Sequence, residues 1–417
     1  MISATPTTPA TPVTPIKKIC GSDNSFTFIF NVEKDHHGLR LDQFIKRFMG
    51  HKTSREFIKK KIKRGHIIIE ASLKASLKAS RMHQQSHFKQ TFKASSTVLS
   101  NDQVKMTIFP SDSLYELEYE HWFNKNITID TKPLTIHEDD NIIVTCKPPF
   151  MATYPTGRHS FNCVTVYYEN QLKQNLHSIH RLDRETSGIL ILGKNPRVSH
   201  ALSFCFEHSL VKKCYFLIAK IKIKDINQSI GNTPIKSLKS LFPLIAEERI
   251  GRSSSRMLME TYPKDSSEGK EAKTIFKFID QIENYILLLA YPQTGRQHQI
   301  RVHAAAHGFP LVGDKIYGGN SSLFLRYKDK VTTTEDYLEM ELPRQALHAI
   351  ALNFPYNPHL NLSALPPAEK NSKNIKNILS NTKRVTYITP LPTDLRDWML
   401  EKKIDLNLVA QQINFEL

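Results

Sequence analysis

Short apolar segments separated by turn residues dominate the chain after residue 130. They run over residues 142–147, 178–183, 189–194, 214–223, 275–279 and 285–291. Segments of this length, rich in Ile, Val, Leu and Tyr and bounded by turn-forming residues, are typical of β-strands. We therefore predict an α+β domain over residues 130–417, built on a mixed, mainly antiparallel β-sheet with a few helices.

One helix is well marked within this domain. Asn195 can cap its first turn, and Pro196 suits its first position. Apolar residues then recur at helical spacing, at Val198, Ala201, Leu202 and Cys205. This stripe predicts a helix whose apolar face packs into the core.

A different pattern occupies the N-terminal part of the chain. Residues 1–25 are rich in Thr and Pro and cannot bury enough surface to fold, so we predict a disordered tail. From Leu41 to Phe48 apolar residues recur at helical spacing, Ser54 can cap a second helix, and residues 66–70 read as a strand.

The second of these helices has a basic face. Its cations are Arg55, Lys59, Lys60, Lys63 and Arg64. Two short helices with a cationic face and a following strand resemble the S4 RNA-binding module, including the Gly-x-Arg-Leu-Asp start at residues 38–42. We expect an S4-like domain over residues 26–115, with a basic insertion at about 71–95, whose cations contact RNA phosphates. A solvated lysine face is the alternative.

The overall charge points the same way. Lys and Arg number 57 against 40 Asp and Glu, a formal net charge of +17, which favours a polyanionic partner over mere solubility. The five cysteines form no CxxC pair, and no apolar run is long enough to span a bilayer. We expect a monomeric protein of the reducing cytoplasm that does not bind membranes.

The stretch HSIHRLDRETSGILILGKN, residues 177–195, sets one carboxylate between two arginines. The pattern predicts that a strand carries Asp183 to a turn, where Thr186 and Ser187 hydrogen-bond the turn backbone and Gly188 permits its tightness. A surface ion pair is the ordinary explanation of such an Asp. The explanation changes once the rest of the chain is considered.

A second polar stretch, QTGRQHQIRVHAAAHG at residues 293–308, concentrates Arg, Gln and His among apolar residues. The alternation predicts a strand with Gln299, Arg301 and His303 on one face and Ile300 and Val302 on the other. A donor-rich face of this kind suits an anionic ligand.

Four ordered motifs then resemble a known family. They are HRLD with Thr-Ser-Gly, KKCYFLIAK at 212–220, the 293–318 segment and LHA at 347–349. Together they resemble RluA-type pseudouridine synthases from about residue 136 to 395. The resemblance implies that Asp183 is the catalytic carboxylate, Tyr215 the active-site tyrosine and Arg301 the basic partner of the Asp. It also implies that Arg181 enters the RNA.

The implied reaction isomerises uridine to pseudouridine in structured RNA such as rRNA or tRNA. Arg296, His298 and Gln299 are expected to contact that RNA. No cofactor is needed, because nothing is oxidised and no atom is lost. Several histidines follow one another here, but without HExxH or an acidic ligand nearby they do not predict a metal site.

Two other classes of function stay open from the sequence. One is a non-catalytic RNA-binding or ribosome-assembly protein on the same fold. The other is a nucleosidase or glycosidase, although that chemistry normally needs a second acid. Whether Asp183 attacks the ribose or acts through an eliminated glycal also stays open.

Overall fold

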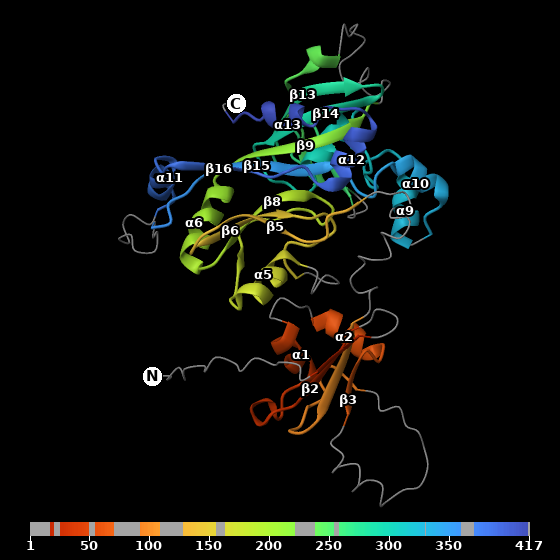
Figure 1. Ribbon diagram of the computed structural model, residues 1–417, viewed down its shortest axis with the longest axis vertical. Coiled ribbons are helices and arrows are strands. Elements are labelled where there is room, and N and C mark those ends of the chain that lie inside the picture. Colours follow the sequence, from red (N-terminus) through yellow and green to blue (C-terminus); the bar gives the residue numbers. More distant parts are fainter. Residues whose placement is uncertain are drawn as a thin grey trace, which may run out of the picture. The chain divides into compact units, whose positions relative to one another are not determined.

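The computed structural model describes residues 17–20, 26–49, 55–70, 92–108, 128–155, 163–221, 238–253, 258–329, 331–359 and 371–415. The chain divides into two compact units (Figure 1). The first comprises Met1–Glu118 with Tyr154–Val166, and the second comprises Tyr119–Thr153 with Tyr167–Leu417. Each unit has its own hydrophobic core.

The first unit contains an antiparallel sheet of order β1-β2-β4-β3 and two α-helices. Its elements are β1 Lys17–Cys20, β2 Phe26–Asn31, α1 Leu41–Met49, α2 Arg55–Lys63, β3 Ile67–Glu70 and β4 Gln103–Ile108. The two predicted helices and the following strand are therefore confirmed. The likeness to the S4 module stays a prediction.

The expectation of a disordered tail through residue 25 is wrong for Lys17–Cys20. These residues form β1, which pairs antiparallel with β2, Lys17 opposite Ile29 and Cys20 opposite Phe26. The edge of β2 offers backbone donors and acceptors that composition cannot reveal. The remainder of the 1–25 segment, and residues 71–91 of the expected insertion, lie outside the described residues.

The second unit is built on a large sheet of order β10-β13-β14-β9-β15-β8-β6-β5, with β16 beside β15 and β7 beside β8. Its strands are β5 Leu134–Glu138, β6 Ile142–Lys147, β7 His177–Ser178, β8 Ser187–Gly193, β9 Lys212–Lys220, β10 Leu244–Ala246, β13 Thr274–Ile282, β14 Tyr285–Pro292, β15 Leu347–Pro355 and β16 Arg384–Ile388. Among these described strands β15 and β8 pair in parallel, and the other pairs are antiparallel. The predicted mixed, mainly antiparallel α+β fold is confirmed.

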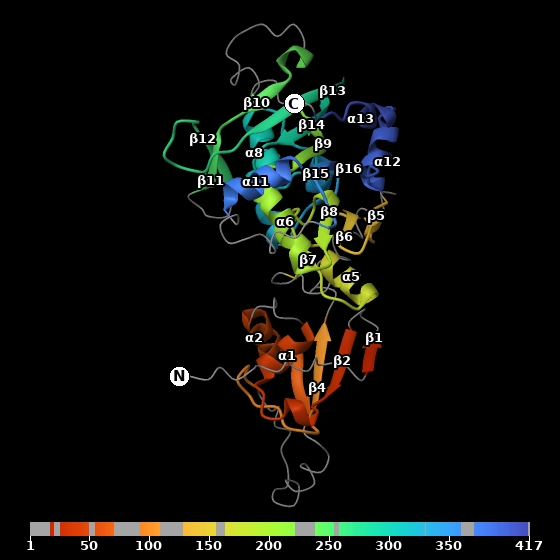
Figure 2. The same cartoon turned by 90° about the vertical axis from the view of Figure 1, so that its left-hand side faces the viewer.

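Helices and one further hairpin complete this unit (Figures 1 and 2). The helices are α5 Val164–Leu172, α6 Pro196–Glu207, α8 Gln299–Ala306, α9 Ser321–Asp329, α10 Thr334–Met340, α11 Ser372–Ser380, α12 Thr393–Glu401 and α13 Asn407–Gln411. The hairpin consists of β11 Arg249–Arg252 and β12 Met259–Tyr262. Helix α6 confirms the prediction, since the Asn195 side chain accepts a hydrogen bond from the Val198 amide at 3.0 Å.

Strand β14 shows why the sheet is buried on both faces. Residues Leu287 and Leu289 belong to one core cluster, together with Trp398 of α12, whereas Leu288 belongs to a second cluster with Ile300 of α8. Alternate residues of a strand point to opposite faces. Helices therefore cover both faces of the sheet, and the strand reads as a continuous apolar run.

Two predicted strands are wrong, and both lie at polar motifs. Of the expected strand at 178–183 only Ser178 lies in a strand, as the second residue of β7, and the chain from 179 to 186 is irregular. The expected strand at 298–303 is instead the start of α8. The alanines at 304–306 favour a helix. The polar and the apolar residues of 299–303 are all buried, so their alternation does not separate a buried face from an exposed one.

Candidate active site

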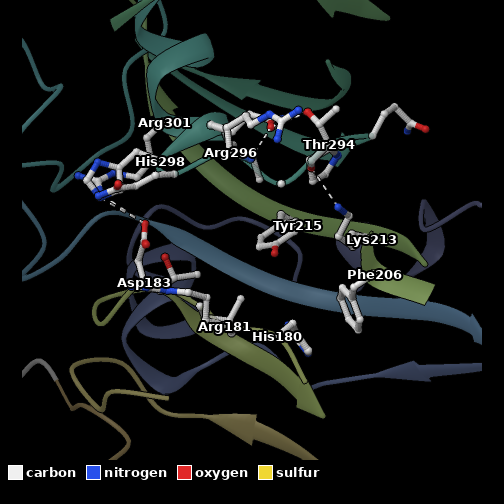
Figure 3. A pocket seen from close by; sticks show the side chains of 18 of the residues that line it. His180, Arg181, Asp183, Phe206, Lys213, Tyr215, Thr294, Arg296, His298 and Arg301 are labelled. Carbon is white, nitrogen blue, oxygen red and sulfur yellow. Dashed lines mark hydrogen bonds and ion pairs between the residues drawn. The ribbon is translucent and has the colours of Figure 1, made fainter. Parts of the chain in front are cut away.

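A pocket of about 740 Å³ opens in the second unit, between the connection from β7 to β8, strand β9 and the loop before α8 (Figure 3). Its charged and aromatic lining includes Arg181, Asp183, Lys213, Tyr215, Arg296 and Arg301. The sequence motifs that were far apart in the chain thus meet in one cavity.

Three buried cations hold the loop that carries Asp183. The Lys147 ammonium donates to the Arg184 carbonyl at 2.9 Å, and Arg344 donates to the Glu185 carbonyl at 3.2 Å. Lys315 forms an ion pair with the Glu185 carboxylate at 3.0 Å. Because buried charges are costly unless they are paired or hydrogen-bonded, this arrangement fixes the loop and leaves Asp183 partly exposed, at 27%.

The Thr-Ser-Gly residues act differently from the prediction. The Thr186 amide donates to the Asp183 carbonyl at 3.1 Å, which closes the turn. The Ser187 hydroxyl instead pairs with His348 Nδ1 at 2.9 Å. Gly188 lies in β8 with φ +117°, and a Cβ there would sit 2.2 Å from the Ala349 carbonyl oxygen. The glycine therefore permits the close approach of parallel strands β8 and β15.

Arg301 faces two carboxylates, one of which the sequence did not single out. It binds Asp314 through two hydrogen bonds of 2.6 and 2.7 Å, and its Nη1 lies 3.6 Å from Asp183 Oδ2. Burial alone would raise the pKa of Asp314, but the charge and hydrogen bonds of Arg301, together with the backbone amides of Tyr317 and Ile316, hold the pKa below its ordinary value. The buried pair with Asp314 holds Arg301 beside Asp183.

His298 lies on the same side of the pocket (Figure 3). It adopts the left-handed region, φ 55°, at the residue before α8, and its Nδ1 is 2.9 Å from the Tyr317 hydroxyl. Its Nε2 is 3.8 Å from Asp183 Oδ2. Burial and the nearby Arg301 lower the pKa of His298, so the ring is neutral at pH 7. The positive charge beside Asp183 is therefore supplied by Arg301.

Tyr215 comes from β9 and lines the centre of the pocket (Figure 3). Burial and the charge of Asp183 raise the pKa of the Tyr215 hydroxyl above its usual range. The hydroxyl thus stays protonated at pH 7. Tyr215 offers an aromatic face and a neutral hydroxyl rather than a phenolate base.

Gln299 lines the pocket, and its expected contact with RNA stays a prediction, but its side chain is engaged within the protein. The side chain is buried, and its carbonyl oxygen accepts from the Thr294 hydroxyl at 2.7 Å and from the Arg296 amide at 3.0 Å. Its amide group donates to the Lys273 carbonyl and the Thr274 hydroxyl, at 3.0 and 2.9 Å. With these hydrogen bonds made, Gln299 anchors the loop before α8. The sequence did not show this because the partners lie on β13 and the β14–α8 loop.

The other expected RNA contacts fall into two groups. Arg181 and Arg296 are exposed and line the pocket, although Arg296 also donates to the Glu271 carbonyl at 2.8 Å. In the first unit Arg55 forms an ion pair with Asp42 at 2.6 Å. The remaining cations of α2, which are Lys59, Lys60, Lys63 and Arg64, are exposed. No finding tests these contacts.

Sequence reasoning missed Asp314, Lys147 and Lys213. Asp314 lies in the GDKIYGG stretch, residues 313–319, and the two lysines stand at the ends of apolar strand segments. The sequence feature that could have revealed them is a charged residue at the end of an apolar segment. A charged side chain at such a position is buried only if it has a hydrogen-bond or ion-pair partner.

The described parts of the chain carry neither a cluster of metal ligands nor a membrane-spanning helix. There, no group of three or more His, Cys, Asp or Glu side chains is arranged to hold a metal ion. No helix in the same residues is both long and apolar enough to cross a membrane.

Comparisons with known proteins show the family of the chain. The chain matches the family model described as RNA pseudouridylate synthase over residues 141–306. It is 32% identical over 228 residues to the ribosomal large subunit pseudouridine synthase C of Rickettsia typhi, covering 54% of this chain and 69% of that protein. It is also 32% identical over 194 residues to the mitochondrial tRNA pseudouridine(32) synthase of Saccharomyces cerevisiae, covering 46% of this chain and 38% of that one.

One solved structure, human RNA pseudouridylate synthase domain containing 4, aligns with a TM-score of 0.45 and 18% identity over 65% of this chain and 94% of that one. The family is shown instead by the similarity to the Rickettsia enzyme, of which the chain covers more than two thirds. The chain belongs to the RluA-type RNA pseudouridine synthases, isomerases that convert uridine in RNA to pseudouridine.

Proposed function

We propose that Asp183 is the catalytic carboxylate of this isomerase. The observation that carries the proposal is its setting: a partly exposed carboxylate in the pocket, on a loop fixed by Lys147, Lys315 and Arg344, with Arg301 at 3.6 Å. Rigid support of a reactive group is what catalysis by positioning requires. Asp183 is the carboxylate of this constellation that reaches the cavity, since Glu185 and Asp314 are engaged by buried cations.

The reaction breaks the bond between ribose C1′ and uracil N1 and forms a bond between C1′ and C5. The proton on C5 leaves to solvent, and N1 gains a proton, so atoms and electrons balance without an oxidant. Positive character develops at C1′ as the first bond breaks, and the Asp183 carboxylate either adds to that carbon or removes the C2′ proton to give a glycal. Both routes use the Asp183 carboxylate, whose Oδ2 lies 3.6 Å from Nη1 of Arg301.

Tyr215 and His298 have supporting roles in this proposal. The ring of Tyr215 lies at the centre of the pocket, where it can hold the uracil face while the base turns. Neutral His298, held by Tyr317, can donate or accept a hydrogen bond without adding charge. Arg181 at the exposed edge is placed to fill the space left by the flipped nucleotide.

The proposed substrate is a structured ribosomal RNA, with transfer RNA as the alternative. The named relatives act on the ribosomal large subunit and on tRNA, and similarity to the ribosomal enzyme spans more of this chain. The target base must leave its stack, at a cost of a few kcal/mol. The exposed cations of α2 would contribute phosphate contacts that offset this cost.

The remaining expectations are part of the same proposal. The enzyme needs neither metal nor cofactor, because the reaction is a redox-neutral rearrangement. It acts as a monomer, since every proposed catalytic residue comes from one chain. The cytoplasm is the proposed compartment, in keeping with the free cysteines Cys146, Cys163, Cys205 and Cys214.

Release of tritium from RNA labelled at uridine C5 tests the catalytic assignment. We expect Asp183→Ala to lose at least about a thousandfold in rate, while Asp397→Ala, at a surface position 39% exposed, keeps the wild-type rate. Release by Asp183→Ala at the wild-type rate would contradict the assignment. If wild type binds RNA but releases no tritium from any transcript, the non-catalytic alternative is correct.

A further inference from the structure

The pocket extends past Tyr215 to a second end that the proposed chemistry does not use. Lys213 and Phe206 line this end, on the side of Tyr215 away from Asp183 (Figure 3). Lys213 lies two residues before Tyr215 on β9, so both side chains point to the same face of the sheet. The arrangement places a cation one strand repeat beyond the ring of Tyr215.

The Lys213 ammonium has room for an anion. It donates one hydrogen bond, of 3.0 Å, to the Thr294 carbonyl. Among the described residues it forms no ion pair within 4 Å, whereas Lys315 pairs with Glu185. Lys147, by comparison, donates three hydrogen bonds to backbone carbonyls. A half-buried ammonium with one carbonyl partner keeps two donors for a ligand. Burial lowers the pKa of Lys213 to about 8, and a bound anion would offset that cost.

Phe206 supplies an aromatic surface at the same end. It comes from the last turn of α6 and is half-buried. One face of its ring stacks on His180, with the centroids 4.3 Å apart and the planes 17° from parallel. His180 Nε2 accepts the Ile191 amide proton at 3.1 Å, and burial lowers its pKa to about 3. The stacked pair is therefore uncharged and rigid, which suits stacking of a nucleobase.

We propose that this end of the pocket binds the nucleotide next to the target uridine, with its base against Phe206 and a backbone phosphate on Lys213. The inference rests on the proposed function, since Tyr215 and Asp183 are taken to hold the target nucleotide. The volume allows it, because pockets for drug-sized ligands measure about 300–1,000 Å³ and 740 Å³ is roomy for one nucleoside.

The position of Lys213 favours phosphate over base. Its neighbours along the lining include Glu207, Ser209 and Gln293, which are exposed, so this end is the rim of the cavity. A phosphate keeps most of its hydration at a rim, whereas a uracil bound for reaction belongs at the enclosed end. A phosphate contact here would fix the register of the RNA strand beside its target without reading the identity of the neighbouring base.

The test measures binding of fluorescein-labelled decauridylate by anisotropy at four salt concentrations. All proteins carry Asp183→Asn, which prevents turnover, and the added changes are Lys213→Gln, Lys213→Arg and Lys212→Gln. Lys212 is the matched control, because it is exposed, lies one residue away and therefore points to the opposite face of β9. Thermal denaturation checks that each variant is folded.

We expect Lys213→Gln to weaken binding about tenfold at low salt and to reduce the slope of log affinity against log salt by about 0.7, the share of one phosphate. Lys213→Arg should restore the slope, and Lys212→Gln should leave it unchanged. Phe206→Leu should weaken binding about fivefold or more without changing the slope, and Phe206→Tyr should not.

Equal slopes for Lys213→Gln and Lys212→Gln would overturn the phosphate contact, and so would failure of the parent protein to bind decauridylate. If Lys213→Gln keeps the slope but slows tritium release in the Asp183 protein, Lys213 acts on the uracil and the proposal is wrong while the catalytic function stands. A slope change without tritium release from wild type would reject the proposed function and leave the subsite.

Discussion

Replacing Asp314 with Asn should both destabilise the protein and disable its site. The side chain of Asp314 is 0% exposed and that of Arg301 is 5% exposed, and the two are joined by two hydrogen bonds of 2.6 and 2.7 Å. Neutralising one partner of a buried pair leaves a buried charge without its counter-charge, which costs about 3–5 kcal/mol. The backbone amides of Ile316 and Tyr317 also donate to Asp314 Oδ1, at 2.9 and 3.0 Å, so the Asp314 carboxylate organises the turn that follows it as well.

The effect on catalysis follows from Asp183, the second carboxylate that Arg301 faces. In the wild-type protein Arg301 Nη1 lies 3.6 Å from Asp183 Oδ2. Without the charge of Asp314, the guanidinium is drawn closer to Asp183. A displacement of about 1 Å at a catalytic group can cost about a hundredfold in rate. We expect Asp314→Asn to lower the rate of tritium release by roughly that factor.

Urea denaturation followed by tryptophan fluorescence measures the stability part, because Trp398 is buried in the core of the second unit. The free energy of unfolding in urea should fall by about 3–5 kcal/mol, which corresponds to a fall of roughly 6–20 °C in the midpoint of thermal unfolding. Glu138→Gln is the control, since its pair with Lys194 is more exposed, at 37% and 13%, and should cost less than about 1 kcal/mol. If Asp314→Asn costs no more than this control, the argument that Arg301 depends on a buried partner is refuted.

Three further predictions follow from other contacts. Gly188→Ala should lower the free energy of unfolding by about 3 kcal/mol or more, because φ is +117° and the new Cβ would meet the Ala349 carbonyl; wild-type stability in urea would show that β8 can shift freely. Gln299→Ala should cost about 2 kcal/mol through the hydrogen bonds it leaves unmade, with normal stability indicating that the residue is free for RNA instead. The pKa of Lys213 is lowered to about 8, so its charge is present at pH 7 and is lost as pH rises through that value. Affinity for decauridylate should therefore fall from pH 7 to about 9 in the parent protein but not in Lys213→Arg, and identical pH profiles would contradict the role of the ammonium.

The lowered pKa of Asp314 also predicts how the stability of the protein changes in acid. The folded-state pKa of Asp314 lies below its ordinary value, so the pair with Arg301 contributes stability above about pH 4, the ordinary pKa of Asp. That contribution is lost as pH falls through the lowered folded pKa. Wild type and Asp314→Asn should therefore differ in stability at pH 6 and converge in strong acid, as urea midpoints across this range can show.

Local sequence pattern predicted most of the regular elements. The helix capped by Asn195 and the two N-terminal helices have apolar residues at helical spacing, and strands such as β14 are short apolar runs bounded by turn residues. The polar motifs gave wrong elements. Around Asp183 and Arg301 the partners of each side chain lie on distant segments, so the alternation along the chain carried no information about the backbone.

The sequence by itself determined the fold class and the order of the motifs, and the family that these motifs resemble implied Asp183, Tyr215 and Arg301 as candidates. Only the tertiary structure decided how they are held. Asp314 behind Arg301, the three buried cations behind the Asp183 loop and the Lys213 end of the pocket all join residues far apart in the chain. Burial and ion pairing depend on what surrounds a side chain, and that is settled only when the whole sheet is assembled.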